Sequence, residues 1–403
     1  MKGTAGEKTK LFILLAGILM LLGKTSKMRV YAMQEQTEEE ETVLEDYYDN
    51  FYDSAGMANL EKELNAIRES YGNTGDISFL DIYELLLTGE VDMAVSAALE
   101  GFYQNITGEV MQNRELLVRL VILVIIAAVF NNYSSIMKIS YVGEQGFYIT
   151  YLLIAVLLLQ SFTIAYDLAE ETVMYLKEIM ECIMPAFYMS IVLCSGLTTS
   201  HMVNSMFLWM LAVIEKVLLV VILPAVRIYF LIVLLNQINT KDRFSKLAGL
   251  IKQAIQFTLK AIVTGIIGLN VMKSMLIPVY ENAKYNVLQK GLSMVPGGAS
   301  FSGLTTILLG AGVLIKNSVG ITVVVILLVL GGVPLLKLLC FYLAYRLILA
   351  LVQPISDNRI LSGIQGAADS TEILVRATAT SIVLSVLSIA IVILTTNVRM
   401  YSG

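Results

Sequence analysis

Long runs of apolar residues fill most of the chain from residue 114 onward, and they limit the possible fold more than any other feature. A transmembrane helix needs about 20 consecutive apolar residues, and several runs reach or approach that length. The runs cover residues 116–137, 147–166, 182–236, 261–278, 303–336, 338–352 and 377–396. Apolar residues make up 57% of the 403-residue chain and charged residues only 15%, against about 25% charged in soluble domains. The sequence therefore predicts an all-α, polytopic integral membrane protein and argues against a soluble enzyme.

The charges between the apolar runs indicate an orientation in the membrane. Five basic residues and one acid lie in the predicted loop 241–260, which is typical of a cytoplasmic loop. The predicted loop 167–181 holds five acids and one lysine and has no cytoplasmic signature. If residue 113 lies outside, the region 182–236 must cross the membrane an odd number of times. We expect about seven to nine membrane segments in all, some of them short, broken or re-entrant.

The amino terminus has the pattern of a secretory signal peptide. Lys2, Lys8 and Lys10 precede a twelve-residue apolar stretch, and small residues stand at Val30 and Ala32. Twelve helical residues span only about 18 Å, which is too short to cross a bilayer comfortably. We expect residues 1–32 to be a signal peptide cleaved after Ala32, with a retained short anchor as the alternative. In both cases the following segment starts outside the cytoplasm.

Residues 33–113 form a strongly acidic region, with nineteen acidic residues against two basic ones. Residues 33–58 have no basic residue and are predicted to be a disordered arm, whose interleaved aromatic residues could alternatively fold onto a basic partner. Residues 59–113 are predicted to form extracytoplasmic amphipathic helices. One covers residues 60–71, and Ser78 begins the next, with Asp81 in a capping-box position.

Residue types used in common catalytic and metal sites are scarce. Cys182, Cys194 and Cys340 lie in apolar stretches without C-x-x-C spacing, and His201 is the single histidine. A disulfide framework, a metal site and a histidine-based triad are therefore not indicated. The phosphate-binding pattern G-x-x-x-x-G-K-[ST] and a basic stripe for nucleic acid are absent as well. We expect no enzyme activity, no cofactor, no metal and no nucleic-acid partner.

Charged residues at membrane depth are the candidate functional residues, because each costs at least about 2.5 kcal/mol to insert. Glu215, Lys216 and Arg227 lie within the long region 182–236. Adjacent helical positions diverge by about 100°, so Glu215 and Lys216 need not pair with each other. Two interpretations stand: the three residues line a functional path, or they lie at an interface where the basic side chains reach the headgroups.

A second group of candidates lies in a glycine-rich stretch. Six glycines and Pro296 lie between residues 291 and 312, and Lys316 and Asn317 follow. Glycine at this density allows close helix packing, or a broken or re-entrant helix over residues 303–320.

The next apolar run carries further polar residues. Lys337 and Arg346 follow Pro334, and Pro354 closes the run before a predicted polar loop over residues 357–376. For both basic residues we expect the charged end to reach the membrane interface.

Several of these motifs resemble the stage III sporulation protein AE family. They are VPGG at 295–298, AGVLIKNSVGI at 311–321, PLLKLL at 334–339 and YRLILALVQP at 345–354. The order of a signal-like start, an acidic helical segment and a polytopic region is also similar to that family, whereas the arm 33–58 has no counterpart there. The resemblance marks the following as family positions without assigned roles: Lys316, Asn317, Gly320, Pro334, Lys337, Gln353 and Pro354.

The resemblance implies a function and a location. Such a protein would be a membrane subunit of the channel-like complex that links the mother cell to the forespore during endospore formation. It would lie in the mother-cell membrane around the forespore, with residues 33–113 outside the cytoplasm. Its implied partners are other stage III sporulation membrane proteins, a secretion-type ATPase and ring-forming subunits. The alternative is a small-molecule permease that acts alone, with Glu215, Lys216 and Arg227 lining its path.

Overall fold

The computed structural model describes a set of helices and the short connections between some of them. The described residues are 57–70, 78–90, 92–94, 96, 118, 122, 140–195, 213–238, 243–265, 267–268, 298–354 and 357–395. Two short helices, α3 (Met57–Ser70) and α4 (Phe79–Leu87), precede the long ones. The long ones are α7 (Ser140–Ser195), α9 (Leu223–Ile238), α11 (Gly298–Val352) and α12 (Asn358–Thr395). Every regular element in these ranges is helical, which confirms the all-α fold class.

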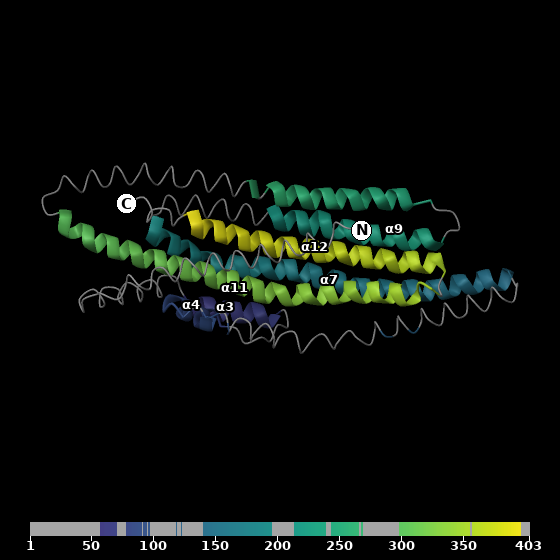
Figure 1. Cartoon of the computed structure of the whole chain (residues 1–403), viewed down its shortest axis with the longest axis horizontal. Coiled ribbons are helices and arrows are strands. Elements are labelled where there is room, and N and C mark those ends of the chain that lie inside the picture. The colour runs from purple at the N-terminus through teal and green to yellow at the C-terminus, as the bar shows by residue number, and fades with distance from the viewer. Residues whose placement is uncertain are drawn as a thin grey trace.

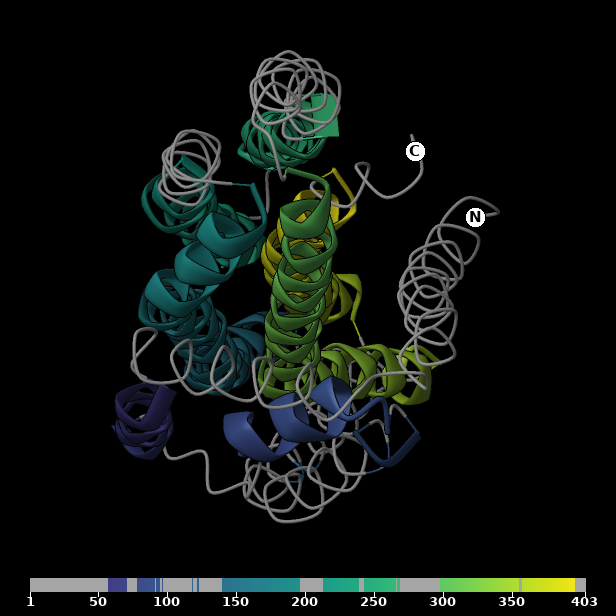
Figure 2. The ribbon, with the colours of Figure 1, turned by 90° about the vertical axis from the view of Figure 1, so that its left-hand side faces the viewer.

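The fold is built around three long helices that run along one axis (Figure 1). α7 has 56 residues and α11 has 55, so each is about 80 Å long at 1.5 Å per residue. α11 and α12 are joined by a short turn and run antiparallel. α11 also runs antiparallel to α7, because the end of α11 packs on the beginning of α7. Figure 2 looks along the bundle and shows α3 and α4 on one flank of it.

Two shorter helical segments lie beside one half of this bundle. A π-helical turn, η1 (Leu218–Ile222), leads into α9. A further helix covers residues 245–265. The predicted loop 241–260 is therefore wrong over most of its length, because residues 245–260 are helical.

Two other predicted interruptions are wrong, and so is the broken-helix alternative for residues 303–320, since the helices continue through all three ranges. Residues 167–181 lie within α7, and residues 358–376 form the beginning of α12. α11 continues through residues 303–320 and across Pro334, so the predicted runs 303–336 and 338–352 belong to one helix without a re-entrant break. The prediction of an odd number of crossings over residues 182–236 assumed that the chain leaves the membrane after residue 166 and re-enters at 182. The continuous α7 has no such break, so this prediction no longer holds.

The physical reason is visible in α7. Its acidic residues Asp167, Glu171 and Glu181 are exposed, while Ala169, Val173 and Leu176 between them are buried. Charged residues at helical spacing occupy the outer face, so the helix can continue without burying them. A stretch of sequence that is polar on average, such as residues 167–181, can therefore be helical and need not form a loop.

The described part of the chain contains four helices that are long and apolar enough to cross a membrane. They are Tyr148–Val192, Val213–Ile238, Val313–Val352 and Asn358–Ala390. Most of the predicted run 116–137, most of 261–278, the predicted signal peptide 1–32 and the predicted acidic arm up to residue 56 lie outside the described residues. The predicted count of segments therefore stays a prediction.

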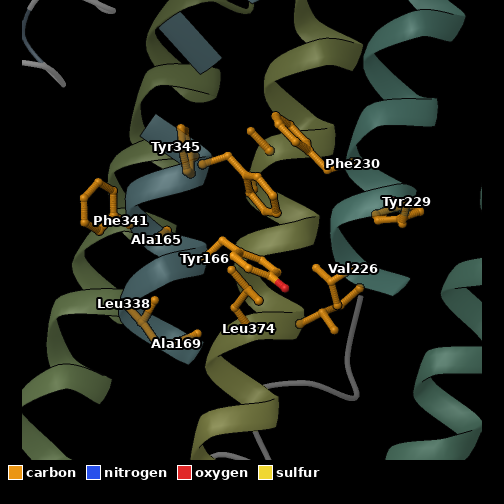
Figure 3. Packing of buried hydrophobic residues seen from close by; sticks show 14 of the residues in the cluster. Ala165, Tyr166, Ala169, Val226, Tyr229, Phe230, Leu338, Phe341, Tyr345 and Leu374 are labelled. Atoms are coloured by element: carbon orange, nitrogen blue, oxygen red, sulfur yellow. The ribbon is translucent and has the colours of Figure 1, made fainter. Parts of the chain in front are cut away.

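The buried apolar residues form two cores, one in each half of the bundle. The first core joins the beginning of α7 to α9, helix 245–265, the end of α11 and the beginning of α12. Figure 3 shows part of it, with Tyr166, Phe230 and Leu374 in its centre. The rings of Phe162 and Phe230 are in contact, with 4.1 Å between their centroids and a tilt of 33° between their planes. The second core joins the end of α7, the first half of α11 and the end of α12 with α3 and α4.

The small helices follow the sequence prediction closely. The hydroxyl of Ser78 accepts a hydrogen bond from the backbone N–H of Asp81 at 3.1 Å, as an N-cap residue does. Phe79, Ile82 and Leu86 are buried in the second core. Gly89 has φ 85°, a left-handed conformation that glycine adopts without strain. The predicted helices at 60–71 and from residue 78 are confirmed to within a few residues.

Exposed large apolar side chains gather around the half of the bundle that holds the first core. We call this set the apolar belt. Its members lie at the beginning of α7, on η1 and α9, on helix 245–265 and at the end of α11. They are Ile149, Leu152, Leu153, Val156, Val220, Val221, Ile228, Leu231, Leu235, Phe244, Leu247, Leu250, Phe257, Leu343, Leu347 and Leu351.

Candidate functional site

A charged cluster lies inside the half of the bundle that carries the apolar belt. The Nζ of Lys252 donates to Oδ2 of Asp369 at 2.8 Å, which joins helix 245–265 to α12. The Nη2 of Arg346, on α11, donates to Asp369 at 3.3 Å and to Glu372 at 3.4 Å. Arg376 donates to the other oxygen of Glu372 at 2.8 Å. We call these five residues the charged cluster.

The two carboxylates of the cluster are well satisfied. Asp369 and Glu372 side chains are only 17% and 15% exposed. In addition to Lys252 and Arg346, Asp369 accepts a hydrogen bond of 2.8 Å from Nε2 of Gln365, one turn earlier on α12. Carboxylates removed from water need such partners, because an uncompensated buried charge is strongly destabilising. The cluster therefore joins helix 245–265, α11 and α12.

A cavity of about 680 Å³ lies beside the charged cluster. It is bounded by α9, helix 245–265, the end of α11 and the beginning of α12. Its polar lining residues are Asn236, Gln237, Ser245, Arg346, Gln353, Asn358, Ser362, Gln365 and Asp369. Its volume is within the range of about 300–1,000 Å³ that is typical of ligand pockets. The cavity lies at the end of the bundle where α9 ends and the turn between α11 and α12 is located.

Three of the residues singled out in the sequence lie at or next to this cavity. Arg346 and Gln353 line it, and the exposed Pro354 follows Gln353 in the turn that ends α11. The backbone N–H of Gln353 still donates to Leu349 at 3.0 Å, so the helical pattern continues up to the turn. Proline at the next position cannot donate in this way.

Glu215, Lys216 and Arg227 do not converge. Glu215 is half-buried and pairs with Lys177 of α7 at 3.5 Å, while the Lys216 side chain is exposed. Arg227 is exposed and lies over the ring of Tyr166 at 5.2 Å. None of these three residues lines the cavity. Within the described residues they form separate surface contacts, so their role in a path stays a prediction.

Lys316, Asn317 and Gly320 lie together on α11 within the second core. Lys316 is fully buried, and its Nζ donates to the carbonyl oxygen of Ile393 at 3.4 Å. The buried side-chain oxygen of Asn317 accepts no hydrogen bond from the described part of the chain. At Gly320 a side chain would collide with Ile393 of α12, so glycine allows the two helices to approach closely here.

Pro334 and Lys337 lie in α11 between the two cores. Pro334 is buried within the continuous helix, and Lys337 is half-buried one turn later. Their sequence positions therefore mark the boundary between the two halves of the bundle. No functional role is assigned to them by this position.

Sequence reasoning missed Lys252, Asp369, Glu372 and Arg376, because residues 241–260 and 357–376 were predicted as loops. A signal was present. Glu372 and Arg376 are four residues apart, and apolar Ile373 and Leu374 lie between them. This spacing is that of an ion pair on a helix with one buried face. Among the described residues, no group of three or more histidine, cysteine, aspartate or glutamate side chains could hold a metal ion.

Comparison with known proteins identifies the family. The family model of the stage III sporulation protein AE family matches residues 77–396, which is most of the chain. The chain belongs to this family. A relative, the stage III sporulation protein AE of Bacillus subtilis (strain 168), is 20% identical over 391 residues. The alignment covers 96% of this chain and 98% of the relative. No solved protein structure matches the chain.

Membership confirms the resemblance seen in the sequence and gives the chain a role in sporulation. The matched range begins at residue 77, just before α4, and ends at residue 396, just after α12. It therefore includes the cavity, the charged cluster and most of both cores.

Proposed function

We propose that this protein is a membrane subunit of a multiprotein channel complex that links the mother cell to the forespore and is required for late forespore development. The observation that carries the proposal is the family match over residues 77–396. Other stage III sporulation membrane proteins, a secretion-type ATPase and ring-forming subunits would be its partners. The protein would lie in the mother-cell membrane around the forespore.

The apolar belt supports a placement in the membrane. Belt residues on α9 and the preceding π-helical turn extend from Val220 to Leu235, and those on helix 245–265 and the residue before it extend from Phe244 to Phe257. These stretches are about 20 Å long, which covers much of a hydrocarbon core of about 30 Å. We propose that this half of the bundle spans the bilayer as a multi-pass domain.

The second core supports an extracytoplasmic placement of the other half. α3 and α4 pack on it, and the large apolar side chains of α11 there are buried rather than exposed. The acidic residues of α7 between positions 171 and 181 also belong to this half or to its boundary, and Glu171 and Glu181 face solvent. A helical bundle with a covered core and a charged surface is stable in water. We propose that it projects from the membrane and offers its surface to the other subunits.

The experiment is affinity purification of the tagged full-length chain from sporulating cells, solubilised in mild detergent. We expect other sporulation membrane proteins to co-purify, and an equally tagged, unrelated polytopic protein to recover none of them. Recovery of the chain without any sporulation membrane protein would contradict membership in a complex. A deletion strain should arrest after engulfment begins and should recover with the intact gene, whereas a normal spore yield would contradict the developmental role.

A further inference from the structure

Arg346 makes the longest ion-pair contacts in the charged cluster, and its guanidinium also lies 5.4 Å from the ring centroid of Tyr342. Lys252 and Arg376 each hold one carboxylate at 2.8 Å, whereas Arg346 shares a single nitrogen between two carboxylates at 3.3 and 3.4 Å. Its Nε is buried and has no hydrogen-bond partner among the described residues. A buried donor without a partner costs about 1–3 kcal/mol, so the carboxylates of the cluster do not satisfy the guanidinium fully.

The net charge of the cluster also favours a negatively charged ligand. Lys252, Arg346 and Arg376 face Asp369 and Glu372, which leaves one positive charge over. Since Asp369 is occupied by Lys252, Arg346 and Gln365, its charge is already compensated. Arg346 and the compensated Asp369 both line the cavity, so the cluster, with its net charge of one positive, borders the open space there. An anion fits this arrangement better than a cation does.

The neutral lining residues fit a phosphate group. The amides of Gln237, Gln353 and Asn358 and the hydroxyl of Ser245 border the same cavity. Amide and hydroxyl groups can donate to phosphate oxygens, and a guanidinium group matches phosphate in a two-point hydrogen bond.

The surroundings of the cavity suit a phosphate that is attached to a lipid. Belt residues Leu347 and Leu351 lie on the same segment of α11 as Arg346, and Leu247 and Leu250 lie beside the cavity-lining residues of helix 245–265. Basic pockets between membrane helices are places where lipid headgroups bind. We propose that this cavity binds a phosphate group, carried by the headgroup of an anionic membrane lipid, with Arg346 as its principal binding residue. The proposal does not depend on membership in a complex.

The test measures lipid retention by the purified full-length chain in detergent, using native mass spectrometry. Phosphatidylglycerol and phosphatidylcholine with identical acyl chains are the two probes. We expect about tenfold preferential retention of phosphatidylglycerol, and we expect Arg346→Gln to abolish the preference. Arg227→Gln removes an exposed arginine of α9 outside the cavity and should leave the preference unchanged.

A second pair of variants tests the cavity itself and leaves the charged cluster unchanged. Gly249 lines the cavity, and a Cβ built there has nothing within 4 Å. Gly249→Met should therefore fold normally and displace the lipid. Gly265→Met is the matched control, because Gly265 has the same open surroundings on the same helix but does not line the cavity. This pair decides the question if Arg346→Gln fails to fold.

Inorganic phosphate distinguishes the source of the phosphate group. If millimolar inorganic phosphate leaves lipid retention unchanged, the site takes a lipid headgroup as proposed. If inorganic phosphate binds to the protein after lipid has been removed, and Gly249→Met abolishes that binding, the site takes free phosphate. The lipid assignment is then overturned. Equal retention of both lipids by the unmodified chain, or retention unaffected by both Arg346→Gln and Gly249→Met, would overturn the whole proposal.

Discussion

Glu61 shows how one side chain joins the two small helices to each other. Its Oε2 accepts hydrogen bonds from the backbone N–H groups of Phe79 at 2.8 Å and Leu80 at 3.3 Å, at the first turn of α4. These N–H groups have no partner within the helix, and a negative charge is favoured at a helix amino terminus. The carboxylate therefore fixes α3 against the beginning of α4.

We predict that Glu61→Ala weakens the packing of α4 on the second core by about 1–2 kcal/mol. Hydrogen exchange of the amides in residues 79–87 measures this, and their protection should fall. Glu69→Ala is the control, because Glu69 is exposed on the same helix and makes no such hydrogen bond to another described residue. Equal protection in both variants would show that the Glu61 contact does not stabilise α4.

At the scale of the elements, close packing of α7, α11 and α12 depends on a small residue at Gly331. A Cβ there would lie 3.0 Å from Ile382 of α12 and 3.2 Å from Leu176 of α7. We predict that Gly331→Leu lowers the unfolding free energy by about 1–3 kcal/mol through overpacking. Thermal unfolding in detergent should show a lower midpoint than Gly265→Leu, whose added side chain enters open space. Identical midpoints would contradict the tight contact of the three helices.

The charged cluster also holds helices together, because its ion pairs join helix 245–265, α11 and α12. Asp369→Asn keeps the shape of the side chain but removes the charge that Lys252 and Arg346 share. Because the partners are about one-third exposed, we expect a loss of about 1–3 kcal/mol rather than the larger cost of a fully buried pair. The thermal midpoint in detergent measures it. Glu171→Gln, at an exposed position of α7, should have no effect, and an equal effect of the two variants would argue against a stabilising role.

At the scale of the whole molecule, the cavity end of the bundle should face the cytoplasm, because the opposite half, which contains the second core, is proposed to be extracytoplasmic. Asn358 is exposed at the cavity end, and Lys62 is exposed on α3. In a chain whose Cys182, Cys194 and Cys340 are replaced by serine, we predict that a cysteine at 358 is labelled only from the cytoplasm. A cysteine at 62 should be labelled by an impermeant reagent from outside. Labelling of both from the same side would contradict the proposed orientation.

The sequence alone determined the class of this protein, because hydropathy, helical periodicity and capping residues are local properties of the chain. The apolar runs indicated the membrane character, the capping pattern of Ser78 and Asp81 predicted the start of α4, and the motifs near Lys316 and Gln353 indicated the family. None of these conclusions requires knowing which helix lies beside which.

Only the tertiary structure decided where helices continue and which charges meet. Residues 167–181 and 358–376 are polar in sequence, yet they remain helical because their charged side chains face outward or toward partners on other helices. Lys252, Arg346 and Asp369 are up to 117 residues apart in the chain. Their pairing depends on the antiparallel packing of three helices, and a window of sequence carries no information about such long-range contacts.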